Sequence, residues 1–162
     1  MDILITVCKE TAADAMESFI HTFSFVPDDR LTWTPTPTAK SAMRIAAHTA
    51  VYAGLFATMI TNRKLPTPEE VPDFRAKADA AEEALTSRVE MERVFRKNTE
   101  NVLTALDSLT PDETGATLDF GHGITVPMTF LLWLPSNHVL GHAGQIDFLQ
   151  TCWDDQEIHF QG

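Results

Sequence analysis

Helical spacing of apolar residues is the feature that most restricts how this chain can fold. Apolar side chains recur every three to four residues from the N-terminus onward, and the spacing returns in three later stretches. It predicts helices over residues 2–24, 42–61, 88–110 and 128–153. Helices of about 20 residues with one apolar face bury that face against one another. We therefore expect an all-α fold, a four-helix bundle.

Local signals mark where the predicted helices begin. Ser41 is a plausible N-cap for the second helix, and Ser87 with Glu90 matches the capping-box pattern at the start of the third. Between them, residues 74–85 are rich in alanine and charge, which indicates a short surface helix. Residues 112–127 contain three glycines and predict a turn-rich loop that could include a short hairpin.

Two histidines on the last predicted helix share one face. His138 and His142 lie four residues apart, so their imidazoles point the same way about one turn apart. A catalytic zinc-type ion usually takes three protein ligands. The best third candidate is His48, which lies among small and apolar residues. The alternative is that these are hydrogen-bonded core histidines, and spacing alone does not decide between the two readings.

Three further side chains could reach such a site. Tyr52 and Arg44 lie one helical turn after and before His48, and His122 lies between two glycines of the predicted loop. Each of the three could instead have a purely structural or solvent-exposed role. Tyr52 could pack in the core, Arg44 could extend to water, and a loop histidine is usually solvated.

The heights of the three histidines predict the order of the helices. At about 1.5 Å per residue, His138 and His142 lie about 15–21 Å into their helix, and His48 lies about 18–20 Å before the end of its own. If His48 is a ligand, it must lie level with His138 and His142, and the heights agree better if these two helices are antiparallel. Residues 62–86 then form a long crossover between the second and third helices, giving up-down-down-up topology. We expect one domain over residues 1–160.

Charge and composition exclude several functions. The 162-residue chain has a net charge of -11, which opposes binding to nucleic acid. Its longest apolar tract, residues 124–134, is too short for the roughly 18 residues of a membrane span, and its start does not resemble a secretory signal. Cys8 and Cys152 lack metal-site spacing and are predicted to be buried free thiols. These features favour the cytoplasm. Residues 161–162 resemble the remnant of a cleavable tag.

Two segments carry a family resemblance. LTWTPTPTAKSAMRIAAH (residues 31–48) and NHVLGHAGQIDFLQ (residues 137–150) resemble the DinB or YfiT-like metal-dependent four-helix bundles. The resemblance implies the up-down-down-up bundle, a divalent metal on His48, His138 and His142, and a homodimer. One position departs from the family pattern: many relatives carry Arg where this chain has Ala143. The resemblance also allows Gln145 to act on a neighbouring group rather than on the metal.

The implied chemistry is that of a metal ion with an open coordination position. Three neutral imidazoles leave the ion its charge, so it can activate water or a thiol. The HVLGH pair lacks the glutamate of HExxH peptidases. We expect an enzyme acting on a small-molecule substrate through a metal-activated thiolate or hydroxide, resembling a thiol S-transferase or a hydrolase. The metal is Zn or Ni, with Fe or Mn as further options, and a low-molecular-weight thiol could be a cofactor. The alternative is a non-catalytic bundle that binds a ligand or partner.

Overall fold

The structure, a computed structural model, describes residues 2–159, so the predicted tag remnant at residues 161–162 lies outside the described residues. Helices form most of the chain, as predicted. In chain order the elements are α1 (Ile3–Ser24), the 3-10 turn η1 (Asp28–Arg30), α2 (Ala42–Asn62), α3 (Val71–Ala84), α4 (Arg88–Asp107), α5 (Pro111–Thr114), β1 (Thr117–Gly121), β2 (Ile124–Pro127) and α6 (Met128–Thr151).

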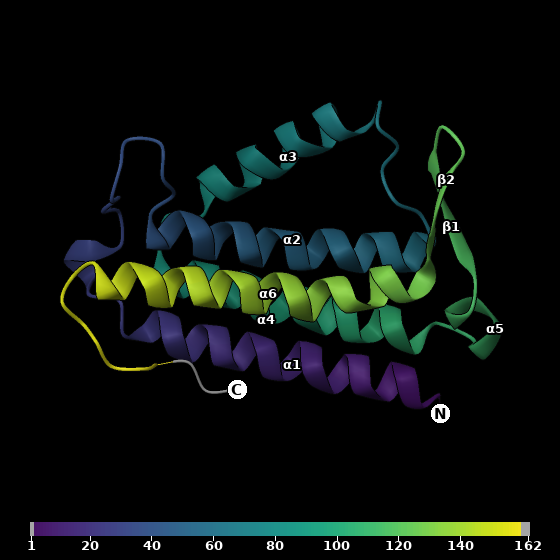
Figure 1. Cartoon of the computed structure of the whole chain (residues 1–162), viewed down its shortest axis with the longest axis horizontal. Coiled ribbons are helices and arrows are strands. Elements are labelled where there is room, and N and C mark those ends of the chain that lie inside the picture. Colours follow the sequence, from purple (N-terminus) through teal and green to yellow (C-terminus); the bar gives the residue numbers. More distant parts are fainter. Residues whose placement is uncertain (1, 160–162) are drawn as a thin grey trace.

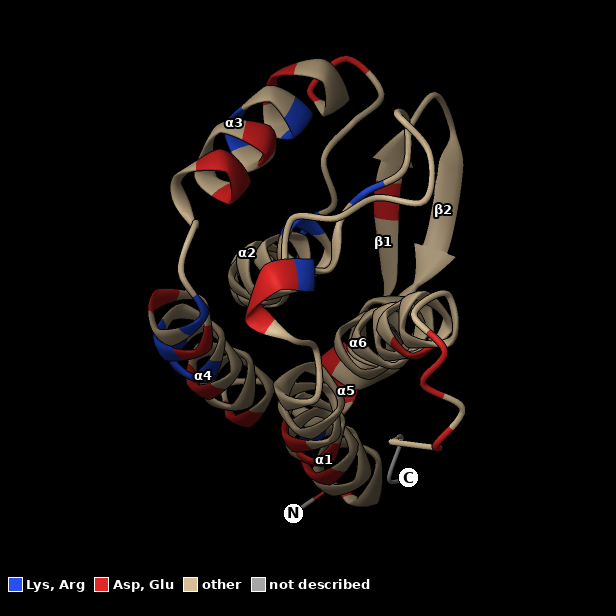
Figure 2. Ribbon diagram, turned by 90° about the vertical axis from the view of Figure 1, so that its left-hand side faces the viewer, with Lys and Arg blue, Asp and Glu red and all other residues tan. Residues whose placement is uncertain are grey.

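Four long helices lie side by side. Figure 1 shows α1, α2, α4 and α6 with their axes roughly aligned, and the turned view of Figure 2 shows them almost end-on around a shared interior. The surface helix predicted within the long connection is α3, which lies outside this group and packs mainly against α2. The connection between α2 and α4 thus covers one side of α2.

The fold is not purely helical. β1 and β2 form an antiparallel hairpin in which Leu118 pairs with Val126 and Asp119 with Thr125. At its turn Gly121, His122 and Gly123 all have positive φ, a conformation that glycine adopts without strain. The all-α prediction was wrong here, because two short strands with exposed polar residues carry little periodic signal.

The buried side chains hold α6 on both sides of its histidine pair. Toward the C-terminal end of α6, Val139 and Ile146 join a cluster around Phe19 and Phe95, whose rings meet edge to face at 5.6 Å. Toward the N-terminal end, Leu131 packs in a second cluster with residues of α2 and α4. Packing before and after the pair fixes the position and rotation of the helix that carries it.

The predicted helix starts are confirmed. The Ser41 hydroxyl accepts a hydrogen bond from the Arg44 N–H, and the Ser87 hydroxyl accepts one from the Glu90 N–H, both at 3.2 Å. The Glu90 carboxylate contacts Arg93 rather than the N-terminal backbone of α4, so only half of the predicted capping box forms.

Within residues 2–159, α2 is the one helix whose length and apolar composition would allow it to cross a membrane. Its most apolar window is 61% buried inside the molecule. This is weak evidence for a membrane span, because a helix in the core of a soluble protein has the same composition.

Candidate metal centre

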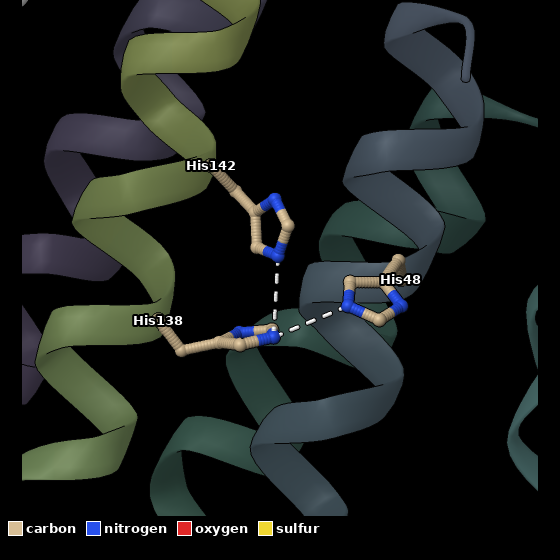
Figure 3. A group of neighbouring side chains, drawn as sticks. All are labelled: His48, His138 and His142. Carbon is tan, nitrogen blue, oxygen red and sulfur yellow. Dashed lines mark hydrogen bonds between the residues drawn. The ribbon is translucent and has the colours of Figure 1, made fainter. Parts of the chain in front are cut away.

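Three histidine side chains converge between α2 and α6. The Nε2 atom of His138 lies 3.2 Å from Nε2 of His48 and 3.2 Å from Nε2 of His142. Figure 3 shows the three rings directed toward one point, His48 from α2 and the other two from successive turns of α6. The structure therefore brings together all three residues that the sequence proposed as ligands.

The separations between these nitrogens suit a shared ion. With metal-to-nitrogen bonds of about 2.0–2.1 Å, two imidazole nitrogens on one tetrahedral ion lie about 3.3 Å apart. Two of the three separations match that value, and all three ligand atoms lie within 4.8 Å of one another.

Hydrogen bonds on the far side of two rings favour the same arrangement. Nδ1 of His48 lies 2.6 Å from a carboxylate oxygen of Glu82, and Nδ1 of His142 lies 2.7 Å from Oε1 of Gln145. Both partners accept, so each Nδ1 carries the proton and each Nε2 keeps its lone pair for a metal. Nδ1 of His138 is buried and has no hydrogen-bond partner within residues 2–159.

Burial keeps the three rings neutral. Burial, with smaller contributions from the neighbouring His142 and His48, lowers the pKa of His138 from 6.5 to about 3. Burial also lowers the pKa of His48, although the hydrogen bond that its Nδ1–H donates to Glu82 acts in the opposite direction. The pKa of His142 is lowered by burial as well, against the effect of Gln145. Neutral imidazole is the form that binds a metal, so at neutral pH little proton competition is expected.

Glu82 is the residue that sequence reasoning missed. It comes from α3, which was predicted as a surface helix, yet its side chain is only 1% exposed. Ala78, one turn earlier, is also buried, and these two are the buried residues of α3. A small residue four positions before an acid on a charged helix was the one available signal, and it is a weak one.

The other candidate residues lie in different settings. The ring of Tyr52 packs against the rings of His48 and His138, with centroid separations of 4.2 and 5.2 Å. Arg44 contacts Glu82 rather than the open face of the site. His122, at the hairpin turn, pairs with Glu69 at 2.6 Å and not with the three histidines.

The thiols differ from the sequence-based expectation in one respect. Cys8 is buried in α1, as predicted, whereas Cys152 is exposed. Cys152 is the C-cap residue of α6. The prediction that both thiols are buried was therefore wrong.

Several solved structures share this fold. A DinB-like protein, YjoA from Bacillus subtilis, aligns with a TM-score of 0.66 at 16% identity over 95% of this chain and 97% of its own. A mycothiol-dependent maleylpyruvate isomerase aligns with a TM-score of 0.65 at 16% identity over 88% of this chain. A histidine-to-alanine mutant of that isomerase gives 0.61 at 15% identity over the same share. This chain spans 60% of the isomerase's length.

At these identities the likeness shows a shared fold. A comparison with curated protein sequences found no match. The sequence model of the DinB superfamily matches residues 10–146, a stretch that includes all three clustered histidines. The match confirms the resemblance noted from the motifs. The chain belongs to the DinB superfamily.

Proposed function

We propose that this protein binds one divalent transition metal through His48, His138 and His142 and uses it for chemistry on a small molecule. The observation that carries the proposal is the convergence of three Nε2 atoms, two of which belong to rings with Nδ1 hydrogen-bonded to an acceptor. Packing alone does not explain why His138 has two other histidine nitrogens 3.2 Å from its own Nε2.

A divalent ion held by three neutral imidazoles supplies a Lewis acid with an open position, where water or a thiol becomes more acidic. The chain's part is to hold the ligands in register and to shape the space beside them. Aromatic rings surround this side of the site. Phe56 packs against His138, and Tyr52 packs against Phe56 and Phe74, with ring centroids about 5–6 Å apart. We expect Zn or Ni ahead of Fe or Mn, because a site of nitrogen ligands binds Zn and Ni more tightly than Fe or Mn.

A low-molecular-weight thiol is the proposed second component. The support is the shared fold with an enzyme named as mycothiol-dependent, at 16% identity and over part of that enzyme's length. S-transfer or isomerisation with a thiol is therefore our leading reaction class, and hydrolysis by activated water is the next. The HVLGH pair lacks the adjacent glutamate of zinc peptidases, which disfavours peptide hydrolysis.

We further propose up-down-down-up connectivity for α1, α2, α4 and α6. The support is the meeting of His48 with His138 and His142, and the long connection from Asn62 to Arg88 that contains α3. The path of the chain in Figure 1 is consistent with it.

A second copy of the chain is the proposed protein partner, in a cytoplasmic protein that contacts neither nucleic acid nor a membrane. The support is the exposed side of α6, a helix with a single charged residue, Asp147. In a chain of net charge -11, this nearly uncharged side is where two copies can meet without placing like charges in direct contact. It carries four exposed large side chains: Phe130, Trp133, Leu140 and Phe148.

The dimer has a direct test. Phe148→Glu places a charge on the proposed contact, so it should shift the protein from dimer to monomer in light scattering coupled to size exclusion. A matched change on α4, Val89→Glu at another exposed position, should leave the mass unchanged. A wild-type protein that is monomeric at about 100 μM refutes a dimer as tight as standard interfaces provide.

The metal and thiol roles are tested with cobalt, whose visible absorption reports its ligands. Cobalt added to the metal-free protein should give the absorption of a low-coordinate site, and His142→Ala should abolish it. Added thiol should then produce a thiolate-to-metal charge-transfer band. If cobalt binds but the band does not appear, the thiol hypothesis is refuted. The cobalt-loaded protein is then screened with hydrolysis substrates. No cobalt binding leaves the non-catalytic bundle as the function.

A further inference from the structure

Glu82 is unusual among the acids of α3. Its side chain is 1% exposed, whereas those of Asp79 and Glu83 on the same helix are 63% and 71% exposed. A buried carboxylate is costly unless charged or hydrogen-bonding groups satisfy both of its oxygens. The partners of Glu82 therefore indicate why an acid occupies this position.

The two carboxylate oxygens have different partners. Oε1 lies 2.6 Å from Nδ1 of His48. Oε2 faces two cations, Arg44 at 3.0 Å and Lys40 at 3.7 Å. Both cations are paired with Oε2, so they balance the buried charge and leave Oε1 to the imidazole.

We propose that Glu82 is a positioning residue, which holds His48 as the Nδ1–H tautomer with Nε2 directed at His138 and His142. The use of this effect for metal binding rests on the proposed function. In the free imidazole the proton can sit on either nitrogen, and a ring with the proton on Nε2 cannot ligate through that atom. A carboxylate that accepts from Nδ1 removes this alternative and fixes the ring plane.

The same contact links the site to α3. This helix lies outside the four long helices and packs mainly against α2, as Figures 1 and 2 show. It buries little of itself, since Ala78 and Glu82 are its buried residues. A metal that prefers the Nδ1–H form of His48 strengthens the Glu82 contact, and docking of α3 strengthens metal binding by the same factor.

The competing explanation is that Glu82 only clamps α3 to α2 through Arg44 and Lys40. Both explanations predict that Glu82→Ala loosens α3, so stability does not separate them. They differ in the state of the His48 ring, which an ion-pair clamp leaves unchanged.

The first test reads that tautomer in metal-free protein. Long-range ¹H–¹⁵N spectra at neutral pH should show His48 protonated at Nδ1 in the wild type. In Glu82→Ala the ring should become a tautomer mixture, and Glu82→Gln should largely restore the Nδ1–H form, because its amide oxygen can still accept. Glu83→Gln, which removes an exposed charge one residue away, should match the wild type. An unchanged His48 spectrum in folded Glu82→Ala overturns the proposal.

The second test measures zinc affinity by competition with a chromogenic chelator. Glu82→Ala should bind zinc about 10–100-fold more weakly than the wild type, with Glu82→Gln between them and Glu83→Gln unchanged. Hydrogen exchange of α3 amides should slow on zinc binding in the wild type and not in Glu82→Ala.

These outcomes distinguish the positioning role of Glu82 from the proposed metal function. Equal zinc affinity of the wild type and Glu82→Ala overturns the positioning role while the metal site stands. A wild type that binds no zinc but shows the expected tautomers refutes the proposed metal function and keeps the effect of Glu82 on His48.

Discussion

Acid should destabilise the metal-free protein through His138. Burial lowers the pKa of this ring from 6.5 to about 3 in the folded chain, while the unfolded chain keeps a value near 6.5. Above the unfolded pKa the ring is neutral in both states. As the pH falls below 6.5, His138 becomes protonated in the unfolded state but stays neutral in the folded state. The free energy of unfolding therefore falls progressively until the pH reaches about 3.

The size of the effect follows from the two pKa values. Each pKa unit corresponds to about 1.4 kcal/mol, so the shift is worth at most about 5 kcal/mol over the whole window. Between about pH 7 and about pH 5, the part due to His138 is about 2 kcal/mol. This is a sizeable share of the total stability of a domain, which is typically about 5–15 kcal/mol.

Urea unfolding in the presence of a chelator measures this effect. We expect the loss of unfolding free energy between about pH 7 and about pH 5 to be about 2 kcal/mol smaller in His138→Gln than in the wild type, because glutamine does not titrate. Val89→Gln, at an exposed position of α4 where neither side chain titrates, should show the same loss as the wild type. Equal losses in His138→Gln and the wild type would refute the argument from burial.

Three further predictions concern packing. Phe95→Ala should lower the unfolding free energy by about 3–5 kcal/mol in urea titration, because the ring is fully buried, whereas exposed Val89→Ala on the same helix should change it by less than about 0.5 kcal/mol. Gly54→Ala should lower the unfolding free energy by about 1–3 kcal/mol, because the new Cβ would lie 2.8 Å from the Asn98 amide. In an Asn98→Ala background most of that cost should disappear, and a double variant whose cost equals the sum of the two single costs would contradict this. Arg63→Ala should cost about 1–3 kcal/mol in thermal or urea unfolding, because its guanidinium joins the end of α2 to α4 and α5, and an unchanged midpoint would contradict this.

The long helices could be predicted because their signals are local. Apolar spacing places α1, α2, α4 and α6 to within about three residues, and the hydroxyls of Ser41 and Ser87 mark two N-termini. The pairing of His138 with His142 is local too, since four residues on a helix define one face. The choice of His48 rested on its small and apolar sequence neighbours and on the family resemblance, because no local pattern links it to the pair on α6.

What could not be predicted depends on tertiary packing. Glu82 and Glu83 are adjacent acids on one charged helix, and only the docking of α3 on α2 buries the first and exposes the second. The glycines of residues 112–127 allowed a short hairpin, but its register depends on cross-strand pairs such as Leu118 with Val126, which are recognisable only when both strands are in place. Cys152 looked like a core thiol until the end of α6 was known.

Metal stoichiometry tests the central claim most directly. Metal-free protein would be dialysed against a small excess of zinc or nickel, and bound metal measured by elemental analysis, for the wild type and for the triple variant His48→Ala, His138→Ala, His142→Ala. We expect about one equivalent of bound metal per chain in the wild type and none in the triple variant. A wild type that takes up no metal, or a folded triple variant that retains it, would contradict the assignment of the three histidines as a metal centre.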